Sequence, residues 1–133
     1  MNSFVNKDFT DENSKKLLGA VGLAARARKC LTGTDICIDY MRAGKGKLLV
    51  IASDISENTM KKLVKTAVFH KIPYTEPGID KGSLAKAVGK KSDAAAVLLT
   101  DGGFVKIIEN LGVEIHITDT EVLLYYGSKC TEI

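Results

Sequence analysis

The chain has 133 residues, of which 45% are hydrophobic and 26% are charged, as is typical of one soluble domain with a sizeable core. No stretch approaches the ~18 consecutive apolar residues that cross a bilayer, which excludes a membrane-spanning helix and argues against a membrane partner. The net charge is only +3, but residues 15–91 hold sixteen Lys or Arg and six Asp or Glu, whereas residues 92–133 hold two and seven. This asymmetry favours a surface that faces a polyanion, although solvated lysines on helix faces would give the same count.

Residues 1–9 carry little pattern, and we expect them to be loose. Residues 10–29 predict an amphipathic helix with acidic residues in its first turn, because apolar residues recur at helical spacing. Its uncharged part, residues 17–25, resembles a secretory signal in outline. Gly19 and Gly22 interrupt that stretch and the basic helix continues to Lys29, so we interpret it as a core helix of a cytoplasmic protein.

A basic junction follows this helix at residues 27–35. Three cations lie in or just before it: Arg26, Arg28 and Lys29. Gly33 lets the backbone turn tightly, and Thr34 or Asp35 could cap the next helix with a side-chain oxygen. Cations beside the free N–H groups of a helix N-terminus can hold a phosphate. An ordinary connection between two helices, with solvated cations, fits the same residues.

Helical and strand patterns alternate through the rest of the chain. Helices are expected at residues 35–43, 60–68 (after a loop at residues 54–59 that holds a helix cap, Asp54 or Ser56), 81–88 and 101–111. Strands are expected at residues 48–52, 72–75, 94–100 and 113–117, and residues 122–126 fit either a strand or a helical turn. Alternation of this kind predicts an α/β fold, a three-layer α/β/α sandwich, in a single domain over residues 1–133 with a C-terminal extension at residues 113–133.

No catalytic or metal-binding arrangement is convincing. Residues 87–92 resemble a phosphate-binding loop, but Leu84 occupies the position of the required first glycine, and the order runs from helix to strand. His70 and His116 have no metal-ligand partner at the right spacing, and three cysteines without a Cys-x-x-Cys pair indicate neither a disulfide framework nor a zinc site. The sequence therefore predicts a protein that is not an enzyme and needs no cofactor.

Two basic sets are candidate contacts for RNA. The first surrounds the junction and comprises Arg28, Lys29, Gly33, Thr34, Asp35 and Arg42; the second surrounds the turn before Ala94 and comprises Lys86, Gly89, Lys90 and Lys91. Loops at one end of a sheet can converge, so the two sets could form one patch. Amides, hydroxyls and cations suit structured RNA, whereas the absence of Trp argues against a platform that stacks single strands.

Four stretches in order carry a resemblance to a known family: residues 17–29, 32–45, 49–59 and 82–90, of which Ala-x-Asp-x-Ser-x-Asn-Thr at residues 52–59 is the most specific. The chain resembles the L7Ae/L30e superfamily of ribosomal proteins, whose archetypes bind kink-turn RNA, and is most similar to its bacterial YlxQ-type branch. The resemblance spans about residues 14–108. It implies a sandwich with a small mixed sheet, and RNA binding by the N-terminus of the second helix, the loop after residues 48–52 and the loop before Ala94.

The chain departs from that family at the positions that would read the kink-turn. The archetypes carry Asn-Glu-x-x-Lys just after the Gly-Thr of the second helix, where this chain has Asp35, Ile36 and Asp39. Asp35 lacks the amide donor, Ile36 cannot accept from a base edge, and Asp39 repels phosphate. The loop before the last strand, residues 90–92, is also Lys-Lys-Ser where the archetypes are apolar. We therefore expect binding to structured RNA, with ribosomal RNA as one candidate, and no tight preference for the kink-turn.

An alternative of a different class is a protein-interaction or scaffold module whose RNA site has decayed. Ile36 and Asp39 favour this interpretation, and the C-terminal extension would then make a weak homo-oligomer. The first hypothesis instead predicts a cytoplasmic protein associated with ribosomes or translation.

Overall fold

The structure is a computed structural model that describes residues 11–116. The predictions for residues 1–9 and 122–126 therefore lie outside the described residues. The elements in order are α2 (Asp11–Arg26), β1 (Cys30–Thr32), α3 (Thr34–Arg42), β2 (Leu48–Ile51), α4 (Glu57–Phe69), β3 (Tyr74–Thr75), α5 (Lys81–Ala87), β4 (Ala96–Leu99) and α6 (Gly102–Glu109).

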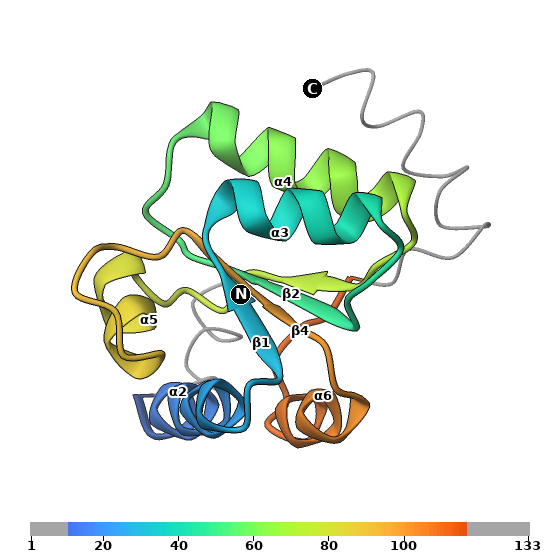
Figure 1. Ribbon diagram of the computed structural model, residues 1–133. Coiled ribbons are helices and arrows are strands. Elements are labelled where there is room, and N and C mark those ends of the chain that lie inside the picture. The colour runs from blue at the N-terminus through green and yellow to red at the C-terminus, as the bar shows by residue number, and fades with distance from the viewer. Residues whose placement is uncertain (1–10, 117–133) are drawn as a thin grey trace.

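A four-stranded mixed sheet forms the middle layer, with the strands in the order β1-β4-β2-β3. β4 pairs antiparallel with both β1 and β2, and β2 pairs parallel with β3. Helices α3 and α4 cover one face of the sheet, and α2, α5 and α6 cover the other (Figure 1). This arrangement confirms the predicted α/β/α sandwich with a small mixed sheet.

The two central strands are fully buried, as their unbroken apolar sequences predicted. Side chains alternate between the sheet faces with a period of two residues. Leu49 and Leu98 pack in the core beneath α3 and α4, whereas Val50 and Val97 pack in the core against α2, α5 and α6. Helix–sheet packing on both faces therefore supplies the apolar burial that stabilises the domain.

Within residues 11–116, three helices begin with a side-chain cap, which fixes where each preceding loop ends. Ser56 Oγ accepts from the Thr59 N–H at 3.2 Å, Asp80 Oδ2 from the Ser83 N–H at 2.9 Å, and Asp101 Oδ1 from the Gly103 N–H at 2.7 Å. The hydrogen bonds from Ser83 hold the pKa of the Asp80 carboxyl below its usual range. Of the two caps expected for α4, Ser56 is the one that forms.

The basic junction contains a strand, and the expectation of a direct connection between two helices was wrong. β1 is an edge strand held by its pairing with β4, and the flanking backbone extends that pairing, since the Thr100 N–H donates to Lys29 O at 2.9 Å and the Gly33 N–H to Ala96 O at 3.0 Å. β1 has only three residues, which are too few to show the alternation of apolar and polar residues that identifies a strand in a sequence. The cap expected from Thr34 or Asp35 was also wrong, because Gly33 is the N-cap of α3 and no side-chain cap hydrogen bond is formed there.

The strand predicted at residues 113–117 is not formed within the described residues, which show only one antiparallel bridge, between Tyr74 and His116. In an antiparallel ladder alternate residues face the partner, so the next N–H on the His116 side would be that of Ile72. That N–H donates to Ala67 O at 2.8 Å instead. The His116 ring stacks on Tyr74 with the ring centroids 4.7 Å apart. Among the described helices, none combines the length and the apolar character needed to cross a bilayer.

Candidate nucleic-acid interface

Three loops converge at one end of the sheet. β1 and β2 both run antiparallel to β4, so the end of β1, the end of β2 and the start of β4 lie together. The backbone contacts agree, because Gly33 donates to Ala96 O at 3.0 Å and Ala52 donates to Ala95 O at 2.9 Å. These are the N-terminus of α3, the loop after β2 and the loop before β4, the three segments that the sequence resemblance singled out.

A shallow hollow of about 380 Å³ lies where the three loops meet. Its walls come from all of them and from the start of α5: Gly33, Thr34, Ile55, Ser56, Thr59, Lys81, Asp93 and Ala95. The loops are tied to one another, since Asp54 Oδ1 accepts from the Lys81 N–H at 2.8 Å and Lys81 O accepts from the Ala94 N–H at 3.1 Å. Lys81 Nζ lies 3.8 Å from Asp93 Oδ2, so an acid partly offsets the positive charge of this wall.

The N-terminus of α3 opens onto this hollow. Gly33 has φ 111° and ψ 146°, a conformation that side chains strain against, and it turns the chain from β1 into the helix. Backbone N–H groups of a first helical turn attract anions when no side chain caps them. Asp35 is exposed in that turn and opposes an anion there, so Thr34 and the Gly33 backbone are better placed than Asp35 to meet a phosphate.

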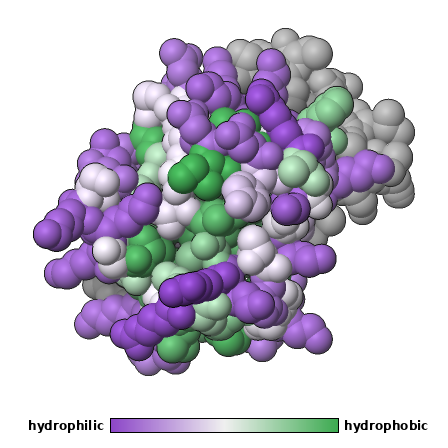
Figure 2. Space-filling view, viewed as in Figure 1, coloured by the Kyte–Doolittle hydropathy of each residue, from purple (hydrophilic) through white to green (hydrophobic). Residues whose placement is uncertain are grey.

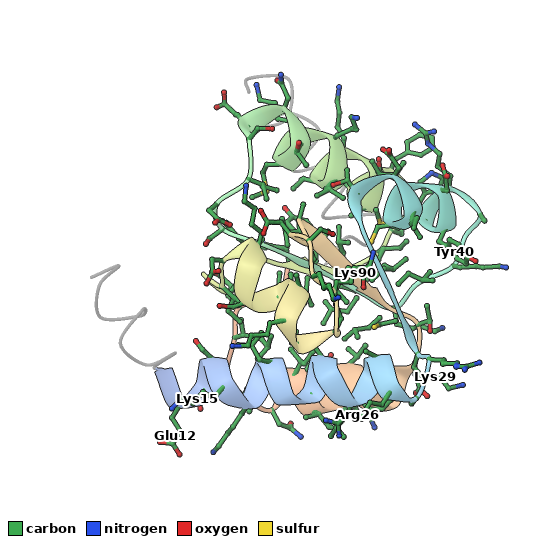
Figure 3. All side chains as sticks on the ribbon, turned by 60° about the vertical axis from the view of Figure 1, so that its left-hand side comes forward. Glu12, Lys15, Arg26, Lys29, Tyr40 and Lys90 are labelled. Atoms are coloured by element: carbon green, nitrogen blue, oxygen red, sulfur yellow. The ribbon has the colours of Figure 1, made fainter. Side chains whose placement is uncertain are left out.

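Lys90 is brought to the start of α3 by the way α5 ends. The Gly89 N–H donates to Lys86 O at 3.1 Å and the Lys90 N–H to Ala85 O at 2.8 Å, with Gly89 at φ 79°, which is a common glycine-terminated helix end. Burial raises the pKa of the Cys37 thiol in α3 to about 12, and the nearby Lys90 charge acts in the opposite direction. Lys90 lies between α5 and α3 in Figure 3, and Lys91 follows it in the same exposed loop.

The remaining predicted cations do not all lie at this end. Arg28 and Lys29 precede β1, and Arg42 ends α3, so these three lie toward the opposite end of the sheet from Gly33. Lys86 lines a separate groove between α2 and α5, which it shares with Arg26. The ten candidate residues therefore form three groups around the β1 edge. One group lies near Gly33, the second comprises Arg28, Lys29 and Arg42 toward the opposite end of the sheet, and the third lies at the groove that Lys86 lines. The separation is small, because a strand of three residues spans about 10 Å.

An apolar strip separates the cations on this side of the molecule. Figure 2 shows hydrophobic surface at the centre of this face, over β1 and the start of α3, with hydrophilic side chains around it. On α3 itself, Ile36 is 45% exposed and Tyr40 is 39% exposed, and Lys45 Nζ lies 5.6 Å from the centre of the Tyr40 ring. Asp35 and Asp39 are exposed as well, so the residues that depart from the family pattern are all on the surface.

Arg28 adopts a conformation that normally favours glycine. It has φ 60° just after α2, where the Arg28 N–H donates to Ala25 O at 3.1 Å and the Lys29 N–H donates to Ala24 O at 2.8 Å. This is the Schellman geometry, in which glycine is the usual residue. Lys71, after α4, is a second exposed cation in the same conformation, with φ 59°.

The sequence resemblance pointed to the loop after β2, but Ile55, Ser56 and Thr59 of the hollow were not named as RNA contacts, and Lys81 lay outside every segment that the resemblance singled out. Ser56 and Thr59 could have been found from the Ser-x-x-Thr spacing at the start of α4, where the two hydroxyls lie 2.8 Å apart. Lys81 gives no such signal, because it belongs to no motif of the sequence. No group of three or more His, Cys, Asp or Glu that could hold a metal occurs in residues 11–116.

The two described cysteines are free thiols without nucleophilic character. Cys37 is buried, with its Sγ 3.7 Å from Leu31 O and 3.8 Å from Ala96 O. Burial raises the pKa of Cys30 as well, although that side chain is only half-buried. A buried thiol with a high pKa stays protonated at neutral pH and is inert.

Comparison with known proteins agrees with this geometry. A model of the ribosomal protein L7Ae/L30e/S12e/Gadd45 family matches residues 15–109. The RNA-binding protein YlxQ of Bacillus subtilis is 34% identical over 91 residues, covering 68% of this chain and 89% of its own length. The large ribosomal subunit protein eL30 of Methanothermobacter thermautotrophicus is 31% identical over 93 residues, covering 69% and 94%.

A solved structure shares the fold as well as the sequence. A protein of unknown function from Bacillus halodurans aligns with a TM-score of 0.65 and 30% identity, over 73% of this chain and 96% of its own. The family match begins within α2 and ends with α6, so it includes every strand of the sheet and the three converging loops. The chain therefore belongs to the ribosomal protein L7Ae/L30e/S12e/Gadd45 family.

Proposed function

We propose that this protein binds structured RNA in the cytoplasm, in association with ribosomes or translation, and that it is not an enzyme. The observation that carries the proposal is the convergence of three loops on the uncapped N-terminus of α3, beside Lys90. The names of the relatives support it, since one is an RNA-binding protein and another is a protein of the large ribosomal subunit.

The cations of the β1 edge would hold the RNA backbone. Lys90 and Lys91 flank the start of α3, and Arg28 and Lys29 lie at the other end of the strand, so successive phosphates of one RNA could contact both ends. Phosphate contacts of this kind supply affinity with little sequence information. The exposed Asp35, Ile36 and Asp39 are unsuited to a kink-turn, so selectivity would come from RNA shape.

The direct test is a salt series with two RNAs, a total structured ribosomal RNA fraction and a kink-turn duplex. We expect binding to structured RNA whose logarithm falls steeply and linearly with the logarithm of salt concentration, with little preference for the kink-turn. A strong kink-turn preference would contradict the interpretation that Asp35, Ile36 and Asp39 on α3 are unsuited to a kink-turn. Absence of binding to either RNA at low salt would contradict the proposal of RNA binding itself.

The exposed apolar face of α3 favours a second candidate, a protein-interaction module. Ile36 and Tyr40 lie one helical turn apart on the surface, flanked by two acids, and apolar residues of this size at the surface are common in protein interfaces. This candidate predicts no RNA binding at low salt. It also predicts a homo-oligomer of the full chain, which a mass measurement in solution would detect.

Replacing Arg28 with Gly is expected to stabilise the fold and weaken RNA binding. A left-handed conformation costs a side-chain-bearing residue about 1–2 kcal/mol, and the extra freedom of glycine in the unfolded chain returns about 0.4–1 kcal/mol of that. We therefore expect R28G to raise the free energy of unfolding by about 0.5–1 kcal/mol, and to reduce the salt slope of RNA binding by about 1 if one phosphate contact is lost.

Lys71 offers a matched control for that substitution. It ends α4 as Arg28 ends α2, with φ 59° and the same pair of hydrogen bonds, from the Lys71 N–H to Val68 O and from the Ile72 N–H to Ala67 O. K71G removes one cation from the same backbone conformation beside β3, at the edge of the sheet opposite β1. Denaturant unfolding and RNA titration would be measured for both. Unchanged affinity and slope in R28G would remove Arg28 from the interface.

A further inference from the structure

An open groove lies on the outer side of α2, where this helix packs against both α5 and α6. This α2 groove has a volume of about 650 Å³, and its walls belong to α2 between Lys16 and Arg26, to the end of α5 at Lys86 and Ala87, and to α6 at Ile107. It continues into the smaller groove between α2 and α5, with which it shares Arg26 and Lys86. Within the described residues it shares none with the hollow where the three loops converge, and its helices cover the sheet face opposite α3 (Figure 1).

Two large apolar side chains at the α2 groove are exposed to water. Leu23 of α2 is 52% exposed and Ile107 of α6 is 44% exposed. The core sides of these helices are occupied by other residues, such as the fully buried Val21 and Ile108. A single exposed leucine is ordinary on a protein surface, whereas apolar side chains from two helices around one groove, bordered by polar groups, are typical of a docking surface.

Gly19 leaves the floor of the α2 groove open. Gly22 on the same helix is explained by packing, because a Cβ there would lie 3.1 Å from Ala87 O of α5. A Cβ at Gly19 would meet nothing within 4 Å, and this residue is exposed. Glycine inside a helix is destabilising relative to alanine, so packing within the domain gives no reason for glycine at position 19. The close approach of another molecule to the helix backbone would give one.

The charges along the α2 groove have one sign. Lys16, Arg26 and Lys86 line it, and no acid does so within residues 11–116. Glu12 forms an ion pair with Lys16 at 3.7 Å, but both side chains are exposed, so water screens this pair and it adds little. Glu12 and Arg26 lie near opposite ends of α2 in Figure 3. Lys16 and Arg26 are ten residues apart, which is about 15 Å along a helix, so a complementary ligand carries acids over that length.

We propose that the α2 groove binds an acidic amphipathic helix of a partner protein. The backbone groups inside α2 are hydrogen-bonded within the helix, so the groove offers side chains and no strand edge. An amphipathic helix is the peptide conformation that docks through side chains in this way. Its apolar face covers Leu23 and Ile107 above Gly19, and its acids face Lys16 and Arg26.

Two other occupants fit the α2 groove less well. RNA would satisfy the cations, but it has no apolar face to cover Leu23 and Ile107. A second copy of this chain docked through the same groove would bring Lys16, Arg26 and Lys86 against an equally basic surface, which costs affinity. The proposal goes beyond RNA binding and does not depend on it, because the α2 groove and the hollow at the start of α3 share no described residue.

A titration of the full-length protein with a synthetic helix tests this docking. The probe is a capped peptide of about 18 residues, long enough to be substantially helical in water, with Leu and Ala along one face and Glu on both borders of that face. The control peptide has Lys in place of every Glu. We expect the acidic peptide to shift the amide NMR signals of residues 16–26, 86, 87 and 107, and the basic peptide to leave them unchanged.

Replacing Gly19 with Gln separates docking from folding. The long uncharged side chain would stand on the groove floor, so G19Q is expected to weaken binding of the acidic peptide by at least about 10-fold. Gln has a higher helix propensity than Gly, so the midpoint of urea unfolding should rise. G102Q is the matched control, because Gly102 begins α6 outside the groove and a Cβ there also meets nothing within 4 Å. Its peptide affinity should equal that of the unchanged protein, and RNA affinity should be unchanged in G19Q.

Reversing two cations of the α2 groove tests the charge complementarity. K16E/K86E is expected to weaken binding of the acidic peptide by about 10-fold or more. K61E/K65E changes the net charge by the same amount at two exposed lysines of α4, which covers the other face of the sheet. This control should weaken peptide binding by less than about 2-fold at physiological salt. Equal weakening in the two variants would mean that the peptide responds only to total charge, and the proposal would fail.

Four further results would overturn the proposal. The first is the absence of shifts at the groove residues with up to about 1 mM acidic peptide. The second is unchanged peptide affinity in G19Q, which would show that no helix lies over the groove floor. The third is a shift of the groove signals on addition of a structured ribosomal RNA fraction, which would assign the surface to RNA. The fourth is movement of those signals with protein concentration alone, which would assign it to a second copy.

Discussion

Changing both Lys90 and Lys91 to Glu is expected to weaken binding to structured RNA by about 100-fold at low salt and to flatten the salt dependence. Each lysine that neutralises a phosphate contributes about 0.7–0.9 to the slope of log affinity against log salt, so the loss of two contacts should reduce the slope by about 1.4–1.8. The new carboxylates would also lie beside the start of α3 and repel the phosphate that the helix N-terminus attracts.

Lys15 and Lys16 provide the matched control, because they are adjacent, exposed lysines on α2. Figure 3 shows Lys15 at the far end of α2 from Lys29, well away from Lys90. Lys16 makes only a surface ion pair with Glu12 at 3.7 Å, so its loss should cost little stability. The K15E/K16E variant changes the net charge by the same amount. An equal loss of affinity in both variants would mean that RNA responds to total charge, and the assignment of Lys90 and Lys91 would fail.

Most of the fold follows from local sequence signals. Four apolar residues in a row predicted each central strand, because a strand covered on both faces needs no polar side. The amphipathic spacing located α4, and Ser56 was one of the two caps that the sequence offered for it. The misses have opposite causes. β1 exists through its pairing with the distant β4, which leaves no local pattern to find. Residues 113–116 carry the local pattern of a strand, but the described residues there pair only at the bridge between His116 and Tyr74.

The sequence predicted which loops form the candidate site, but it did not predict which of the candidate residues lie together. Lys90 and Gly33 are 57 residues apart in the sequence, and only the antiparallel placement of β1 and β2 on β4 brings their loops to one end. The same topology puts Arg28 and Arg42 toward the opposite end, which sequence proximity to Gly33 could not reveal. The strain at Arg28 was also invisible, because a left-handed arginine has no sequence signature.

Replacing Leu17 with Ala should destabilise the domain by about 2–5 kcal/mol, the range for a buried leucine that leaves a cavity. Leu17 lies on α2, is 0% exposed and packs in the core that α2 forms with α5 and α6. A domain of this size has only about 5–15 kcal/mol of stability in total. The midpoint of urea unfolding should therefore fall sharply without a change in slope.

Leu23 on the same helix is the control, because L23A makes the same chemical change at a side chain that is 52% exposed. L17A and L23A change the helix propensity of α2 by the same amount. The difference between their free energies of unfolding therefore measures the packing of α2 on the sheet. We expect L23A to change the free energy of unfolding by less than about 1 kcal/mol. Equal losses in both variants would mean that α2 is not seated on the face described here. The turn after α2 places Arg28 and Lys29 before β1, so the proposed contacts at that end of the interface depend on this packing.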